Sequence, residues 1–600
     1  MSVEIRETQP LTGRAGRFTA ITSRSTNEEG TSNRSRGGAW HPSYTILAVA
    51  LLERIGRAGI IINLVQYLEY HSFLEWSTAD TTIAALLCTK LSFMGAVFSG
   101  LLADTLFGHY RVLLASLVLQ FVGSLLLLAA TVEEFESQRD DAHQGSFEGL
   151  VTSGLVLFGL GVAGCSGTEI PLGVSQHALR GETEQKAKSF FPRYYWFQNV
   201  GAVLGVSVIG TVQVQAKHNL HVYGYVLPPV FFFLSIVTFL VLNRGILTET
   251  PSRAHPFTDT WRTMKEAVRV RWRRRGRVTL GSVAHAANRQ YWKNTKGSLA
   301  NWVRYAEESH GGCILYNTVA RVHNFLSVIA ILAAMVFCEV TIAQTYTSFV
   351  SQGNVMSLPI PRDSESRSSF YIPASFFASF NNVGVLLGIP LVVFIVYPCW
   401  QRFSGGTPPS HLKRITVGMV IAILAIAAAA VLEVERRSEG RWNSTVVVDH
   451  DNSGNPGNPR TILTVSSVSI SYQIPQYTLS GISEVFIIVS ALEFAYSRSP
   501  TGMKGISVGL VYGLAGLTSI VNVGVLQLIQ AHDKTLFYVN GTQGKVHFYF
   551  IALGCIMVVG LAIFQVAASR FKTAPIYAST STEKKSYNAT YSAAVRSFAA

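Results

Sequence analysis

The residues that could do chemistry in this chain are charged side chains inside long apolar stretches. They are Glu53, Arg54, Arg57, Lys90, Glu169, Glu339 and Glu484. A charge at the centre of a bilayer costs on the order of 3 kcal/mol on insertion scales, so each is expected to face a cavity or a partner. Glu53 and Arg57 are four residues apart and share one helical face, whereas Glu53 and Arg54 do not. A buried carboxylate beside a cation can carry a proton, because moving the cation changes how firmly the proton is held.

Charged side chains near a helix end can instead reach water. This alternative fits Glu493 best, and for Glu169 both interpretations stay open.

Composition points to a polytopic membrane protein. Hydrophobic residues make up 48% of the 600 residues and charged residues only 14%, against about 25% charged residues in soluble domains. Six cysteines are too few for a dense disulfide framework. No phosphate-cradling glycine loop, metal-ligand cluster or nucleophile elbow is present in the sequence, so we expect no enzyme, no cofactor and no metal site.

Twelve stretches are long and apolar enough to cross a bilayer, which takes about 20 residues each. The four without any charge are 112–132, 222–242, 415–432 and 548–568. The other eight lie at about 44–68, 78–103, 149–177, 190–213, 318–349, 370–398, 464–492 and 505–529. The predicted fold is therefore an all-α membrane protein with twelve transmembrane helices. Every third helix is uncharged, so these four are expected at the rim, facing lipid.

Loop charges predict the orientation. The loops 69–77 and 132–147 are acidic, whereas 399–414 carries only basic charges. Basic loops face the cytosol, which places both termini there. Asn443 and Asn540 then begin glycosylation sequons in outer loops.

The predicted division has five parts. They are a polar, disordered cytosolic tail (1–43), a six-helix bundle (44–243), a basic cytosolic linker (244–316), a second six-helix bundle (317–570) and a cytosolic tail (571–600).

The linker carries 14 Lys and Arg residues against 5 acidic ones. Nucleic acid is one conceivable partner of such charge, but contact with the anionic lipid bilayer is favoured for a loop between membrane helices. A cytosolic partner protein could also bind there. The division into six plus six helices is the plan of transporters, with a site near the midplane between two halves.

The segment between the second and third predicted helices resembles the signature loop of the major facilitator superfamily. Its marked positions are Gly100, Asp104, Gly108 and Arg111. The resemblance implies that the glycines allow tight helix crossing and that the acid and the base tie helix ends together.

Two further stretches, 190–201 and 472–504, resemble the proton-coupled oligopeptide transporter family. The segments 481–484 and 372–374 look most like its peptide/histidine transporter branch, whose members serve endosomes and lysosomes. The resemblance implies an endosomal or lysosomal membrane, with the plasma membrane as the alternative.

The resemblance also implies roles for individual residues. Glu484 would meet a substrate amino group, Asn199 and Asn381 would hydrogen-bond a peptide backbone, and Tyr195 and Trp196 would form a wall or serve packing only.

Departures from the family pattern concern the charges. The family motif Glu-x-x-Glu-Arg begins here with Ala50, and Ser166 aligns with the family lysine on helix 4. Losing both members of a buried ion pair leaves no stranded charge. The usual carboxylate-binding arginine aligns with Ile61. Arg57 and Lys90 could replace it, or could only neutralise Glu53.

We therefore expect a proton-coupled symporter of small peptides, such as di- and tripeptides, or of amino acids such as histidine. Protonation of Glu53, next to Arg54, or of Glu339 would weaken the hold of that acid on a cation and let the two halves move. One alternative is an uncoupled facilitative carrier, favoured by Ala50 and Ser166. Another is a non-transporting sensor or scaffold that recruits a cytosolic partner.

Overall fold

The computed structural model describes most of the chain between residues 41 and 573. The described residues are 41–70, 91–137, 144–215, 221–242, 246, 256–273, 297–345, 347–357, 374–438, 444–448, 461–532 and 545–573. The chain divides into the units Met1–His41 and Pro42–Ala600, and everything below concerns the second unit. Lys90, Asn443, Asn540 and most of the predicted tails, residues 1–40 and 574–600, lie outside the described residues.

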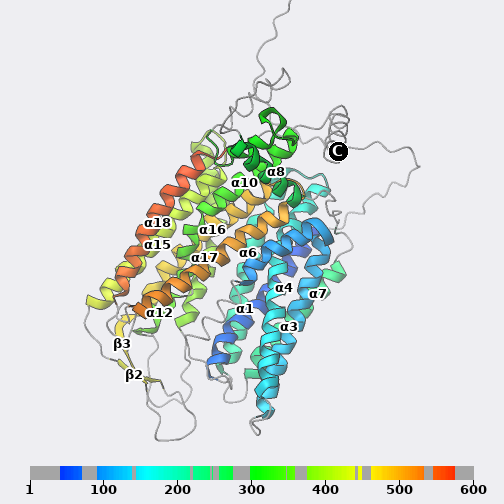
Figure 1. The fold of residues 1–600 in the computed structure, drawn as a ribbon. Coiled ribbons are helices and arrows are strands. Elements are labelled where there is room, and N and C mark those ends of the chain that lie inside the picture. Colours follow the sequence, from blue (N-terminus) through cyan, green and yellow to red (C-terminus); the bar gives the residue numbers. More distant parts are fainter. Residues whose placement is uncertain are drawn as a thin grey trace, which may run out of the picture. The chain divides into compact units, whose positions relative to one another are not determined.

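Long helices dominate the first half (Figure 1). They are α1 (Pro42–Tyr70), a helix over residues 91–102 that continues into the π-helix η1 (Ala103–Phe107), α3 (His109–Ser137), α4 (Gln144–Leu179), the short α5 (Glu184–Lys188), α6 (Phe190–Gln215) and α7 (His221–Val241). Helix α1 packs against α6 and α7, and α3 packs against α4 and α7.

The connection between the halves contains α8 (Pro256–Arg273) and the short 3₁₀ helices η5 (Asn301–Ala306) and η6 (Glu308–His310). The second half then comprises α10 (Tyr316–Ala334), α11 (Val336–Gln344), α12 (Ser348–Asn354), η7 (Ala374–Ala378), α13 (Ser379–Leu391), η8 (Val392–Val396), α14 (Tyr397–Phe403), α15 (His411–Ser438), η9 (Ile470–Gln473), α16 (Ile474–Arg498), α17 (Lys504–His532) and α18 (Val546–Ser569). Helix α15 packs between α16 and α18.

Helices occupy each of the twelve stretches that the sequence predicts to span the membrane, as far as these are described, although the stretch 464–492 begins in a strand. Nine helical segments among the described residues are long and apolar enough to cross a bilayer. Helix α1, α6 and the helix at 91–107 cover three further predicted stretches. The count of twelve spans and the orientation of the termini remain predictions.

The four uncharged helices are indeed among the least buried. In α3, α7, α15 and α18, between 33% and 39% of the most apolar window is buried, against 78% in the segment that contains α16. The segment Phe376–Phe403 is still less buried, at 28%, which the charge pattern did not predict. Low burial within the protein therefore accompanies the absence of charge in these four stretches without being limited to them, and their contact with lipid stays a prediction.

Two predicted helices are interrupted. The stretch 318–349 is broken between α10 and α11 and again before α12. The stretch 370–398 contains Pro390 in α13, followed by the π-turn η8 and by Pro398 at the start of α14. Proline removes a backbone donor and its ring clashes with the preceding turn, and a π-bulge is one way for a helix to relieve that strain.

A small sheet corrects the predicted all-helical architecture locally. Strand β3 (Thr461–Ser469) lies between β1 (Met356–Ser357) and β2 (Ser444–Val448), parallel to β1 and antiparallel to β2. The helix predicted to begin at 464 therefore begins only after β3 and η9, at Ile474. The segment contains threonine and valine, residues that favour strands. The sequence prediction joined it to the following helix because both are apolar.

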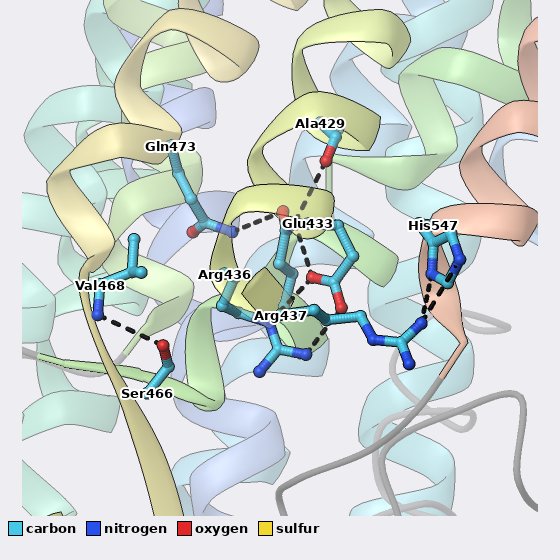
Figure 2. A network of polar contacts seen from close by, with 9 residues as sticks. Ala429, Glu433, Arg436, Arg437, Ser466, Val468, Gln473 and His547 are labelled. Carbon is cyan, nitrogen blue, oxygen red and sulfur yellow. Dashed lines mark hydrogen bonds and ion pairs between the residues drawn. The ribbon is translucent and has the colours of Figure 1, made fainter. Parts of the chain in front are cut away.

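Helix α15 also extends beyond its predicted end at 432 and buries an ion pair there. Glu433 and Arg436 are almost fully buried, and their side chains approach to 2.7 Å. Gln352 of α12 donates to Glu433 at 3.0 Å, and Gln473 of η9 donates to Gln352 at 3.1 Å. Figure 2 shows Glu433 and Arg436 of α15 with Gln473 beside them. The network joins α12, α15 and η9, so the charges serve to hold three elements together.

We predict that Arg436→Met destabilises the protein by about 3–5 kcal/mol, because it leaves the buried Glu433 without its cation. The double variant Glu433→Gln/Arg436→Met should recover most of this loss, since the amide keeps an acceptor for Gln352. Thermal unfolding of the purified protein measures both variants. A double variant no more stable than the single one would show that the pair is not coupled.

Candidate functional site

Glu484 occupies a buried position where the two halves of the chain meet. It lies in the middle of α16 and is 6% exposed. The hydroxyl of Tyr195, on α6 of the first half, donates to Oε2 at 2.8 Å. The amide of Asn381, on α13 of the second half, donates to Oε1 at 2.8 Å. One carboxylate therefore receives a hydrogen bond from each half.

Glycines let α13 and α16 come close enough for this contact. A Cβ atom at Gly481 would lie 2.1 Å from the backbone oxygen of Asn381, and one at Gly384 would lie 2.6 Å from that of Thr478. Only glycine allows two helix backbones to approach this closely. The short amide side chain of Asn381 consequently reaches Glu484.

Asn199 and Trp196 lie on the same helix, α6, but make different contacts. The amide of the buried Asn199 donates to the backbone oxygen of Tyr195 at 2.8 Å, one turn earlier on α6. The half-buried Trp196 packs against a cluster that contains Val385 and Val485. In this state Asn199 braces the turn that carries Tyr195, and Trp196 fills space between α6, α13 and α16.

A second polar cluster lies within the first half. Glu53 is fully buried, and its carboxylate lies 3.1 Å from the guanidinium of Arg57. Arg57 also donates to Oε1 of Gln198 at 2.9 Å. Gln198 in turn donates to Oε2 of Glu169 at 3.3 Å, and the hydroxyl of Tyr194 donates to the same oxygen at 2.6 Å. Two acids from α1 and α4 are thus joined through one arginine and one glutamine.

Gln198 and Tyr194 are not among the site residues predicted from the sequence. They are four residues apart, as are the neighbouring Tyr195 and Asn199, so α6 presents two adjacent polar faces. Tyr194 and Gln198 contact the acid of α4, whereas Tyr195 contacts Glu484. The spacing of four within an apolar helix is the signal that could have identified them.

Ala50 and Ser166, the residues that depart from the family charge pattern, are both buried. Ala50 is fully buried, and its backbone oxygen accepts a hydrogen bond from Gln198 at 3.3 Å. Arg54 is half-buried and lies against Gly201, where a Cβ atom would stand 2.9 Å from that of Arg54. Arg57 forms an ion pair with Glu53 and donates to Gln198, and its role in substrate binding stays a prediction.

Glu339 lies in α11, directly after the break at Met335, and is half-buried. Glu493 is buried and lies 2.8 Å from Arg414, so it forms an ion pair instead of reaching water. Glu169 is likewise buried, at 1% exposure.

The two halves also meet at the signature loop. Both carboxylate oxygens of Asp104 accept backbone hydrogen bonds from the start of α17, from Gly505 at 3.1 Å and from Ile506 at 2.9 Å. The first N–H groups of a helix have no partner within the helix, and the positive end of its dipole favours an acid. Gly100 lets the backbones cross here, and Gly108 adopts a positive φ of 78°. Arg111 is exposed.

Comparisons with known proteins agree with this architecture. A sequence model described as the POT family matches residues 110–546. Solute carrier family 15 member 3 of Rattus norvegicus is 24% identical over 580 residues, covering 89% of this chain and 93% of that protein. Protein NRT1/PTR FAMILY 8.3 of Arabidopsis thaliana is 25% identical, covering 90% and 92%.

Solved structures share the fold. An auto-inhibited POT family peptide transporter aligns with a TM-score of 0.60 at 20% identity, over 90% of this chain and 98% of that one. A POT family transporter in complex with 5-aminolevulinic acid aligns with a TM-score of 0.54 at 16% identity, over 88% and 96%. The fold is therefore that of the major facilitator superfamily, as the sequence predicted.

Proposed function

Because this chain belongs to the POT family, a family of multi-pass membrane transporters, we propose that it is a proton-coupled symporter of small peptides, or of amino acids such as histidine. The observation that carries this proposal is the position of Glu484, a buried acid held by one donor from each half.

Substrate binding follows from the chemistry of that contact. Tyr195 and Asn381 are both hydrogen-bond donors to Glu484. A substrate ammonium group is also a donor, and its charge makes the hydrogen bond stronger. An amine-bearing substrate would therefore replace these donors, and replacing Tyr195 would free α6 from α16. Binding at Glu484 is in this way linked to the movement of one half against the other.

Proton coupling would arise in the second cluster. Glu53 and Glu169 are two acids joined through Arg57 and Gln198. Their contacts run through α6, the same helix that carries Tyr195. A shift of α6 on substrate binding would move Gln198 away from Arg57 and Glu169, and so change how easily the acids of the cluster take up a proton. Glu339 is a further candidate for the proton-carrying acid, because it lies in a predicted membrane helix.

The test of coupling uses Glu53→Gln and Glu169→Gln, each of which fixes an acid in a neutral form. With one proton per substrate, a gradient of one pH unit supports about tenfold accumulation. We expect at least one variant to lose gradient-driven uptake into proteoliposomes while keeping counterflow of labelled substrate. If both variants and Glu339→Gln accumulate substrate like the unchanged protein, the proton does not travel on these acids.

A second candidate function is uncoupled facilitative transport. Ala50 and Ser166 favour it, because both are buried where the family pattern has ionisable residues. Uptake by the unchanged protein, with and without a protonophore, distinguishes the two functions. A non-transporting sensor would bind substrate in a thermal-shift assay but show no counterflow.

We propose an endosomal or lysosomal membrane as the location, with the plasma membrane as the alternative. The acidic lumen of such a compartment would supply the proton gradient. Fluorescent tagging of the protein, together with deglycosylation of variants at Asn443 and Asn540, tests the location and the predicted orientation.

A further inference from the structure

Helix α8 is attached to the body of the protein by one face. Thr263 and Ala267 on this face are fully buried. Ala267 packs in a cluster with Val303 and Ala306 of η5 and with Val319 and Ala320 of α10. These α10 residues belong to the first two turns of the membrane-spanning segment Tyr316–Asn354. Helix α8 therefore packs beside the first turns of α10, where a candidate membrane span begins (Figure 1).

The opposite face of α8 is apolar and exposed. Phe257, Trp261, Val268 and Trp272 follow one another at spacings of four, seven and four residues, so they project from one side of the helix. Trp261 is 64% exposed and Trp272 is 78% exposed. Two tryptophans on one exposed face are unusual for a surface in contact with water, whereas tryptophan is enriched at the boundary between lipid and water.

A row of basic side chains flanks the apolar face. Arg262, Arg269 and Arg273 repeat the spacing of seven and four, one residue after the apolar row, and all three are exposed. Lys265 and Arg271 add two more exposed cations, whereas the acids of the helix are only Asp259 and Glu266. Glu266 lies 3.3 Å from Arg269. The exposed face is thus apolar in the centre and positive along its edges.

A hollow of about 430 Å³ opens on the same face. It is lined by Val268, Arg271, Trp272 and Trp302. The guanidinium of Arg271 and the two indole rings combine a cation with aromatic surface, a combination that suits a phosphate group with an attached acyl chain.

We propose that the exposed face of α8 is a binding surface for anionic phospholipid of the membrane in which the protein lies. The aromatic row enters the boundary between headgroups and acyl chains, and the arginines contact headgroup phosphates. An amphipathic helix with aromatic residues on one side and basic residues beside them binds membranes in this manner. Charge complementarity selects anionic lipid over zwitterionic lipid, and α8 packs against the first turns of α10, where the predicted membrane span begins.

The experiment uses the full-length protein in nanodiscs and quenching of tryptophan fluorescence by brominated lipid. The chain has nine tryptophans, so the signal of two is obtained as the difference between the unchanged protein and Trp261→Phe/Trp272→Phe. We expect brominated phosphatidylserine to quench this difference signal more strongly than brominated phosphatidylcholine does. High salt should reduce the preference, since it screens the arginines.

The charge variant is Arg262→Gln/Arg269→Gln/Arg273→Gln. This variant should need a severalfold higher fraction of phosphatidylserine for half-maximal quenching than the unchanged protein does. The matched control is Arg180→Gln/Lys186→Gln/Lys188→Gln, which removes three basic charges at the connection between α4 and α6 and leaves α8 unchanged. It should quench like the unchanged protein, and a common elution volume and counterflow rate would show that both variants are folded.

Three results would overturn the proposal. The first is equal quenching by the two brominated lipids whatever the arginines. The second is no lipid quenching together with quenching by soluble iodide, which would place the face in water. The third is protection from both quenchers, which would show that protein covers the face.

Discussion

Replacing Glu484 by glutamine should weaken the binding of amine-bearing substrates roughly 100-fold, which corresponds to about 3 kcal/mol. The carboxylate is buried and accepts hydrogen bonds from Tyr195 and Asn381. A neutral amide presents one oxygen instead of two and carries no charge, so an ammonium group loses its ionic partner in a site shielded from water. Equilibrium binding of a labelled dipeptide to the purified protein measures this loss.

Two comparisons separate the loss of an ionic contact from general damage. Glu493→Gln changes a second buried acid on the same helix, one that pairs with Arg414 at 2.8 Å. It should lower thermal stability and leave substrate affinity within about threefold of the unchanged protein. A des-amino analogue of the dipeptide should bind the unchanged protein and Glu484→Gln with similar affinity. An unaltered dipeptide affinity in Glu484→Gln would remove this residue from the site.

Tyr195→Phe tests the link between binding and movement. The hydroxyl of Tyr195 competes with substrate for Glu484 and also ties α6 to α16. Its removal should therefore not weaken substrate binding, but it should raise the rate of counterflow if the tie holds the halves together.

The charged positions of the site were predictable from sequence because charge in hydrocarbon is costly. Glu53 and Glu484 lie within apolar stretches and are buried as expected, with partners that offset the cost. The uncharged members were harder to find. Gln198 and Tyr194 carry no charge, so their cost in an apolar helix is small and their spacing of four is the only local signal, although both donate to Oε2 of Glu169.

Helix ends and the sheet were less predictable, for a different reason. Sequence patterns detect a helix end where charged residues begin, but Glu433 and Arg436 neutralise each other inside the protein and α15 continues past them. The pairing of β3 with β1 joins residues about 110 positions apart in the chain. Such contacts depend on the tertiary arrangement, and local residue preferences carry little information about them.

The close crossing at Gly100 leads to the second large effect. A Cβ atom at Gly100 would lie 2.4 Å from the backbone oxygen of Gly505 and 2.5 Å from its carbonyl carbon, on the first turn of α17. The obstacle is backbone, so no side chain can rotate away. Gly100→Ala should push the helix over residues 91–102 away from α17 and so withdraw Asp104 from the N–H groups of Gly505 and Ile506.

We call the state in which Asp104 contacts the start of α17 the closed state. Overpacking of this kind costs about 1–3 kcal/mol, which would lower the ratio of closed to open protein roughly 5- to 150-fold. Uptake into proteoliposomes should fall accordingly, whereas affinity at Glu484 should be retained because α13 and α16 do not take part in the crossing. Closure can be followed by maleimide labelling of Ile506→Cys, a position that packs against Val97 and Leu101 of the first half. Labelling of the Ile506→Cys variant should be slow when residue 100 is glycine and fast when Gly100→Ala is added.

The matched control for this substitution is Gly524→Ala, on the same helix α17. A Cβ atom there has no neighbour within 4 Å among the described residues, so the change should leave uptake and labelling unaltered and could add a little helix stability. If Gly100→Ala transported as fast as Gly524→Ala, the contact between Asp104 and α17 would not be a step in transport. A loss confined to Gly100→Ala would instead show that this end of the two halves must close in every cycle, because the substitution leaves the substrate contacts in place.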